Sequence, residues 1–115
     1  MSEDKTVLFI GAWNMYLRAC DIPATGWNTP TAEYNFDADI KRKHRFDWAF
    51  VGQKVAVEVE GNAWNVRGGG RHMQNSDLEK YNIAAAMGWR VFRFSPAMLK
   101  NDPFMCAAQV FAGLK

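Results

Sequence analysis

The stretch KVAVEVEG, residues 54–61, constrains the fold more than any other part of the chain. Successive side chains of a β-strand point to opposite faces, so its three valines share one face while Glu58 and Glu60 share the other. A valine-rich face is typical of a strand packed against a sheet interior. The chain is therefore built around a β-sheet, and one of its strands presents two neighbouring carboxylates.

Hydrophobic periodicity predicts the remaining elements. Apolar residues that recur every three or four positions indicate helices, and residues that alternate indicate strands. Pro and Gly mark the loops between them. Helices are expected over residues 6–20, 75–88 and 102–114, and strands over 32–36, 44–51, 54–60 and 89–95.

The order of these elements indicates an α/β fold. The chain reads αβββαβα, and the helix between the third and fourth strands is long enough to form a crossover. A crossover of that length joins parallel strands, whereas the first three strands form a meander. We expect a mixed four-stranded sheet flanked by helices. The 115 residues are enough for a single domain over 1–115.

Composition sets limits on location. No apolar run has the length of a membrane span, and nothing near the N-terminus resembles a targeting peptide. Cys20 and Cys106 show no zinc-binding spacing, and we expect both to be free buried thiols. These features predict a cytoplasmic protein without a membrane partner.

The central hairpin brings the acidic residues together. A tight turn at Gly52 and Gln53 pairs Val51 with Lys54, and this register places Asp47 opposite Glu58. In the same alternation Phe46, Trp48 and Phe50 share one face, and Asp47 lies on the other.

Opposed carboxylates require an explanation. Side chains directly opposite each other have Cβ atoms about 4.5–5.5 Å apart, so Asp47 and Glu58 repel unless something compensates their charge. One interpretation is a solvated sheet face on which acids happen to meet. The other is a site for Mg²⁺ or Mn²⁺, because such hard cations take one or two carboxylates and keep several waters. A cation of this kind activates water for phosphodiester hydrolysis.

Two clusters of basic residues suit a polyanionic substrate. The net charge of +2 does not identify a nucleic-acid-binding protein, and each cluster is equally consistent with a solvated loop. Next to a metal site, both clusters favour DNA binding. The expected nucleic-acid contacts are Arg42, Lys43, Arg45, Arg67 and Arg71.

The Gly-rich segment that contains the second cluster, RGGGRHMQ, lacks the Lys-Ser/Thr of a P-loop. We interpret it as a flap beside the metal site. Its His72 is either a general acid or base for the reaction or a surface histidine.

The motifs HRFDWAF, KVAVEVEG, GRH and EKYNIAAAMGWRVFRFS, in this order, resemble the PD-(D/E)XK nuclease superfamily over roughly residues 32–99. More narrowly they are similar to small phage and prophage endonuclease-like proteins, relatives of the very-short-patch-repair endonucleases and the Holliday-junction resolvases. The resemblance implies a restriction-endonuclease-like fold and a site in which Asp47 and Glu58 bind the metal, with help from the backbone carbonyl of Val59.

The resemblance also implies roles that this chain fills differently. The lysine of the superfamily motif falls at Glu60, which would serve as an extra ligand or base. Lys80, on the following helix, or Lys54 would then supply the displaced cation. Some members carry a further acid upstream, a role that Glu33 could take.

Together these features predict a Mg²⁺-dependent DNA endonuclease that acts as a homodimer, with branched or junction DNA as a candidate substrate. Its catalytic residues would be Asp47, Glu58, Glu60, Lys80 and His72. Two alternatives remain open. One is a nucleic-acid-binding module that kept the fold but lost catalysis, and the other is a phage-encoded protein that binds a host protein.

Overall fold

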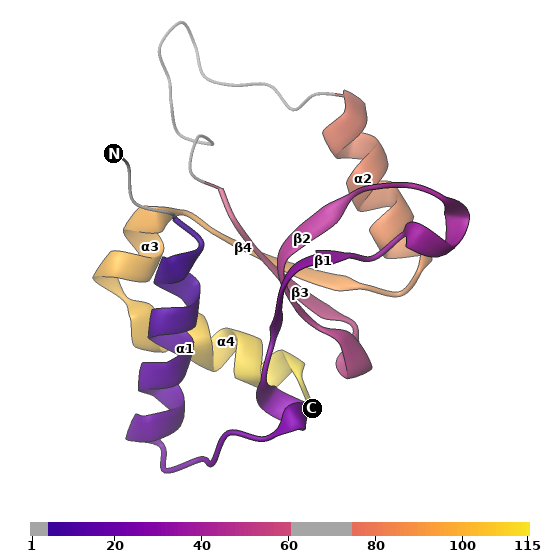
Figure 1. The fold of residues 1–115 in the computed structure, drawn as a ribbon. Helices are drawn as coiled ribbons and strands as arrows, with labels where there is room; N and C mark the ends of the chain where they lie inside the picture. The colour runs from indigo at the N-terminus through magenta and orange to yellow at the C-terminus, as the bar shows by residue number, and fades with distance from the viewer. Residues whose placement is uncertain (1–4, 61–74) are drawn as a thin grey trace, which may run out of the picture.

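The computed structural model describes residues 5–60 and 75–115 (Figure 1). Short 3-10 turns connect several of the elements, at Gly26–Asn28, Ala38–Ile40 and Val51–Gln53. The strands and α-helices are α1 (Val7–Ala19), β1 (Thr31–Asn35), β2 (Arg45–Phe50), β3 (Val55–Val59), α2 (Asn75–Ala86), β4 (Arg90–Phe94), α3 (Pro96–Asn101) and α4 (Pro103–Gly113).

The strands form one mixed sheet in the order β1-β2-β3-β4. β2 pairs antiparallel with β1 and β3, whereas β3 and β4 are parallel across the α2 crossover. This arrangement confirms the predicted meander and parallel pair. The pairs Trp48–Val57 and Phe50–Val55 also confirm the predicted register between β2 and β3.

The connection between β2 and β3 is longer than expected. Val51–Gln53 forms a 3-10 turn, and Lys54 follows it in the left-handed region with φ 56°. Phe50 and Val55 are the first pair of the ladder, where a two-residue turn would have paired Val51 with Lys54. One residue is added to the connection on each side, so the register is unchanged.

The C-terminal region holds a helix that the periodicity did not reveal. α3 follows β4 directly, so the order is αβββαβαα rather than αβββαβα. Ser95 caps α3 by accepting a hydrogen bond from the Met98 N–H at 3.1 Å, and Pro96 takes the first helical position. Asp102 caps α4 in the same way, as expected from the sequence, through the Met105 N–H at 3.3 Å.

Helices cover both faces of the sheet. α1, α3 and α4 lie together on one side, and α2 lies on the other (Figure 1). The larger core on the α1 side includes Phe9, Trp13, Phe50, Val55, Val57, Val59, Phe94, Leu99 and Val110. The smaller core on the α2 side consists of Phe36, Phe46, Ala49, Ala56, Ala84 and Trp89.

The alternation of β2 breaks at Asp47. Trp48 and Phe50 pack against the α1-side core, as expected, but Phe46 packs in the α2-side core with Ala49. The prediction that Phe46 shares a face with Trp48 and Phe50 was therefore wrong. On the neighbouring strand Glu33 has a φ of 54°, and it lies between the paired residues Ala32 and Tyr34. This local irregularity turns Phe46 to the other face.

Two further expectations concern location. Cys106 is buried and Cys20 is exposed, so only one of the two free thiols is buried as predicted. Within residues 5–60 and 75–115, no helix is long and apolar enough to cross a membrane.

Candidate functional site

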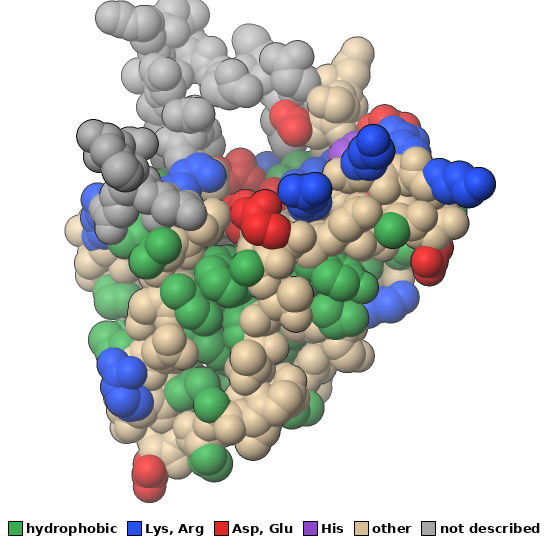
Figure 2. Space-filling view, viewed as in Figure 1, with side chains coloured by type: hydrophobic (Ala, Val, Ile, Leu, Met, Phe, Trp, Pro, Cys, Tyr) green, Lys and Arg blue, Asp and Glu red, His purple; other side chains and the backbone are tan. Residues whose placement is uncertain are grey.

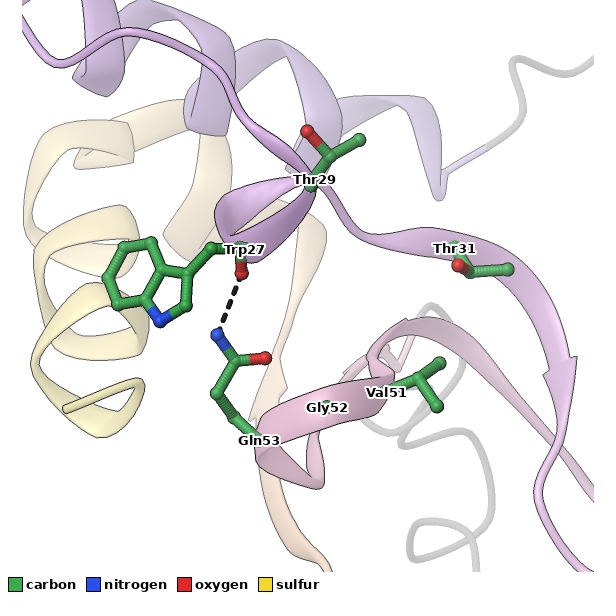
Figure 3. Close-up of a pocket in the computed structure, with 7 residues that line it drawn as sticks. Trp27, Thr29, Thr31, Val51, Gly52 and Gln53 are labelled. Atoms are coloured by element: carbon green, nitrogen blue, oxygen red, sulfur yellow. Dashed lines mark hydrogen bonds between the residues drawn. The ribbon is translucent and has the colours of Figure 1, made fainter.

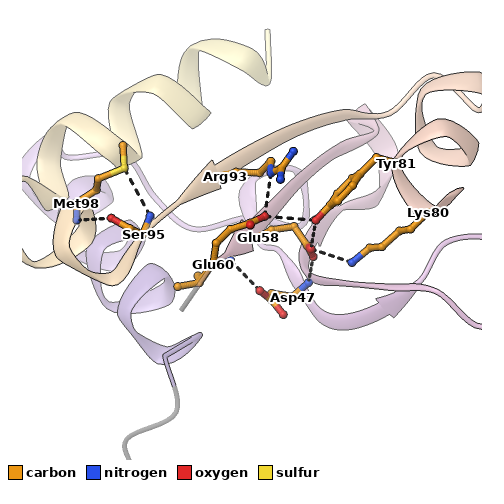
Figure 4. Close-up of polar contacts among 9 residues, drawn as sticks. Asp47, Glu58, Glu60, Lys80, Tyr81, Arg93, Ser95 and Met98 are labelled. Carbon is orange, nitrogen blue, oxygen red and sulfur yellow. Dashed lines mark hydrogen bonds and ion pairs between the residues drawn. The ribbon is translucent and has the colours of Figure 1, made fainter. Parts of the chain in front are cut away.

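Asp47 and Glu58 meet where β2 and β3 separate (Figure 4). Beyond Trp48 the two strands are linked by side chains. The Asp47 N–H donates to Glu58 Oε2 at 3.0 Å, and the Val59 N–H donates to Asp47 Oδ2 at 2.7 Å. Each carboxylate therefore binds the backbone of the opposite strand, and these reciprocal bonds hold the acidic residues at the end of the ladder.

Glu58 is the most connected side chain of the site. It is only 7% exposed, and Lys80 Nζ and the Tyr81 hydroxyl both donate to its Oε1 at 2.8 Å. Both donors come from α2, which packs over this face of the sheet. A buried carboxylate needs such charge-assisted partners, because burial without them is costly.

Glu60 lies beside Glu58 and is paired with Arg93 of β4. Arg93 Nε donates to Glu60 Oε2 at 2.8 Å, and the Tyr81 hydroxyl lies 3.3 Å from the same oxygen. The Arg93 guanidinium also lies 4.5 Å from the centre of the Tyr81 ring, within range of a cation–π contact. Tyr81 thus lies between both glutamates and both cations.

The electrostatics of the site favour protonation of two groups. Burial raises the pKa of Asp47 above its ordinary value, and the charge of Glu58 adds to this effect. The Val59 N–H and the charges of Lys5 and Lys80 oppose it only in part. Burial, followed by the charge of Glu58, raises the pKa of Tyr81 well above its ordinary value, so its hydroxyl stays a donor.

The two candidates for the displaced lysine make different contacts. Lys80 reaches the acids, whereas Lys54 Nζ donates to the Met87 carbonyl at 2.7 Å on the exposed turn. Lys80 therefore provides part of the charge compensation that the opposed acids require.

Other residues expected at the metal site are not gathered there. Glu33 is exposed on β1. Across the described part of the chain, no three Asp, Glu, His or Cys side chains form a group that could hold a metal ion. The pair of Asp47 and Glu58 is the acidic core of the site, and Val59 is positioned beside it through its N–H.

Three predicted residues, Arg67, Arg71 and His72, lie outside the residues that the structure describes. The first basic cluster is described. Arg42 forms an ion pair with Glu79 of α2, with Arg42 Nη2 2.7 Å from Glu79 Oε1, while Lys43 and Arg45 are exposed. In Figure 2, Lys and Arg side chains line the same edge of the molecule as a patch of acidic side chains.

Sequence reasoning missed three contributors to the site. Tyr81 donates to Glu58, Arg93 pairs with Glu60, and Lys5 acts on Asp47 through its charge. The adjacency of Tyr81 to Lys80 was no signal, since neighbouring residues of a helix do not face each other.

A second recess lies between the turn Gly26–Asn28 and the β2–β3 connection (Figure 3). It has a volume of about 460 Å³, and Gln53 Nε2 closes one side by donating to the Trp27 carbonyl at 2.7 Å. Its lining contains no charged side chain, so it lacks the carboxylates and basic side chains found at the acidic site.

The chain was compared with known proteins. No protein-family model and no curated protein matches its sequence. Among solved structures it is similar to one described as the catalytic domain of the homing endonuclease I-Bth0305I, with a TM-score of 0.60 and 19% identity. The match covers 97% of this chain and 94% of that one. At this identity the likeness establishes a shared fold, which confirms the predicted α/β class and mixed four-stranded sheet.

Proposed function

We propose that the protein is a metal-dependent DNA endonuclease that hydrolyses phosphodiester bonds. The observation that carries the proposal is the opposition of Asp47 and Glu58 at the end of the β2–β3 ladder, with Lys80 bound to Glu58. The fold shared with an endonuclease catalytic domain supports the same reaction class. Fold likeness alone does not establish activity, so the proposal depends on these side chains.

The residues present fit a hard divalent cation. Asp47 and Glu58 supply oxygen ligands from adjacent strands, and Mg²⁺ requires only one or two carboxylates. Burial and the charge of Glu58 raise the pKa of Asp47, and a bound cation would oppose both effects. Glu60 and the Val59 carbonyl would complete the site, and Glu33 is a more distant candidate.

The chemistry that such a cation supplies is a water of lowered pKa and stabilisation of charge on the phosphate. The protein's own groups orient the acids. Lys80 and Tyr81 fix Glu58 Oε1, which leaves Oε2 toward Asp47. The Lys80 ammonium also places positive charge where a phosphate would lie, and His72 is the proposed acid or base for proton transfer.

Cleavage assays test the proposal. Plasmid and branched DNA are incubated with the protein in Mg²⁺, Mn²⁺ or EDTA, and metal-dependent cutting is expected. Asp47→Ala and Glu58→Ala should abolish it. Asp21→Asn is the matched control, because Asp21 is exposed with φ 57°, a conformation that Asn tolerates. Equal loss of activity in the control, or cutting in EDTA, contradicts the proposal.

A readout independent of activity is the melting temperature. A cation that binds only the folded protein raises it by mass action. Mn²⁺ should therefore stabilise the wild-type protein and leave Asp47→Ala unchanged. A preference for branched over linear DNA, and a homodimer by light scattering, are the remaining parts of the proposal, and each is tested on the same samples.

A DNA-binding module without catalysis is the second candidate. It is favoured by the ion pair of Lys80 with Glu58, which already compensates one of the two acids without a metal. DNA retention without cutting in any metal would support this candidate. A stable protein partner with neither cutting nor DNA retention would support the third interpretation, a protein-interaction factor.

A further inference from the structure

The loop before β2 contains the basic run KRKHR at residues 41–45 and is anchored on a buried carboxylate. Asp37 is 0% exposed, and its Oδ1 accepts hydrogen bonds from the His44 N–H at 3.1 Å and from Asn35 Nδ2 at 3.0 Å. Its Oδ2 lies 2.6 Å from His44 Nδ1. Because an ionised carboxylate is only an acceptor, His44 donates from both its backbone and its ring.

Two side chains, Asn35 and Arg42, make further contacts that fix the loop. Asn35 Nδ2 lies 2.7 Å from the His44 carbonyl and 3.3 Å from the Arg42 carbonyl. The Arg42 guanidinium reaches both carboxylate oxygens of Glu79 at 2.7 Å, which ties the loop to α2. The loop is therefore held by Asp37 and Asn35 and by Glu79 of α2.

Side chains, rather than backbone N–H groups, provide the positive charge of this loop. The N–H groups of Ile40, Lys41 and Arg42 already donate to carbonyls of Asp37 and Ala38. Lys41 and Lys43 are exposed, and both line a recess of about 380 Å³ together with Arg42 and His44. Consecutive cations repel one another, so holding them together favours an anionic ligand.

We propose that this recess is a preorganised binding site for a backbone phosphate of duplex DNA. Lys41 and Lys43 contact the phosphate. Arg42 and His44 are positioning residues, which hold the loop through Glu79 and Asp37. This phosphate site makes the proposed function more specific. The choice of DNA as the ligand rests on that proposed function. It also assigns Arg42 a different role from the direct DNA contact that its charge suggested.

The helix α2 contacts both the basic loop and the acidic site. Glu79 and Lys80 are consecutive residues of α2; Glu79 binds the loop, whereas Lys80 binds Glu58. Lys43 lies four positions before Asp47 in the chain, and an extended chain covers about 13 Å over four positions. This is close to the width of the major groove, about 12 Å, so one duplex can contact both sites.

Duplex binding in EDTA tests the proposal without cleavage. The affinity of the wild-type protein for a fluorescein-labelled duplex of about 30 base pairs is measured by anisotropy over a range of salt concentrations. Each lost phosphate contact lowers the slope of log K against log salt by about 0.9. The double variant Lys41→Gln/Lys43→Gln should lower the slope by about 1–2 and weaken binding at least tenfold at about 0.1 M salt.

The matched control is Lys100→Gln/Lys115→Gln, which removes the same charge from exposed lysines outside the loop. It should leave the slope unchanged. His44→Ala should also lower the slope, because the loop loses its anchor on Asp37. If His44→Ala fails to fold, the variant Lys41→Gln/Lys43→Gln still tests the proposal.

Binding within twofold of wild type and an unchanged slope in the lysine variant would overturn the site, as would an equal loss in the control. A wild-type protein that does not bind the duplex would overturn it too. A wild-type protein that binds through the loop but cuts no DNA in Mg²⁺ or Mn²⁺ would refute the nuclease and leave the phosphate site standing.

Discussion

Replacement of Asp47 by Asn should make the folded protein more stable at neutral pH. The half-buried carboxylate faces Glu58, and the pKa of Asp47 is raised by burial and by that neighbouring charge. The Asn amide oxygen can still accept the Val59 N–H, so the change removes charge and keeps the hydrogen bond. Repulsion between directly opposed acids amounts to about 1 kcal/mol. For a chain of 115 residues, that is a rise in Tm of about 4 °C.

The gain should depend on pH in a defined direction. A carboxyl whose folded-state pKa is raised contributes stability that is fully present below its ordinary value of 3.8 and is lost as pH rises through the folded-state value. The stability that Asp47→Asn gains over wild type should therefore vanish in acid. It should grow as the pH rises through the folded-state pKa of Asp47. Urea denaturation of both proteins from about pH 3 to pH 8 measures the difference directly.

Two results would refute this reasoning. One is a loss of stability in Asp47→Asn at pH 7, and the other is an equal gain at both ends of the pH range. Asp21→Asn is the control, since substitution of an exposed acid should change stability by no more than about 0.5 kcal/mol. A stabilised variant that is also inactive would fit a site that sacrifices stability for function.

Four other substitutions probe the electrostatics of the site and the packing of the helices. Lys80→Met should destabilise the protein by about 1–3 kcal/mol in urea denaturation, because Glu58 loses its cation but keeps its other donors. An unchanged free energy of unfolding would contradict a stabilising ion pair. In a spectrophotometric titration of the native protein, Tyr81 should stay protonated past the ordinary value of 10.0, and Tyr81→Phe should remove the late-titrating group. Gly11→Ala should stabilise by about 0.5–1 kcal/mol, since a Cβ there meets nothing within 4 Å. Gly113→Ala should destabilise by about 1–3 kcal/mol, since its Cβ would lie 2.7 Å from Phe92 Cζ, and thermal denaturation compares the pair.

The sheet could be predicted because its signals are local. Alternating valines identified β3, and the hairpin register followed from pairing across a short connection. The connection is two residues longer than predicted, but one residue was added on each side, so Asp47 still lies next to Glu58. Lys80 contacts Glu58, but its role as the displaced cation stays a prediction.

The remaining features of the fold and of the site depend on contacts that hydrophobic periodicity does not encode. Phe46 changes face beside the irregularity at Glu33 of β1, and no pattern in β2 indicates this. The six residues of α3 are too few for a helical period to be recognised, although Ser95 and Pro96 form a start signal. Tyr81 and Arg93 reach the acids only because α2 and β4 pack beside β3.

The spacing of the polar site along the chain has a consequence for the order of folding. The two acids are 11 residues apart, whereas Lys80 is 22 residues from Glu58 and Arg93 is 33 from Glu60. Short loops close at lower entropic cost, so the central hairpin can form before the cations arrive. The isolated hairpin would then hold two mutually repelling charges without compensation. Its persistence requires the crossover helix and the last strand, which makes assembly of this region cooperative.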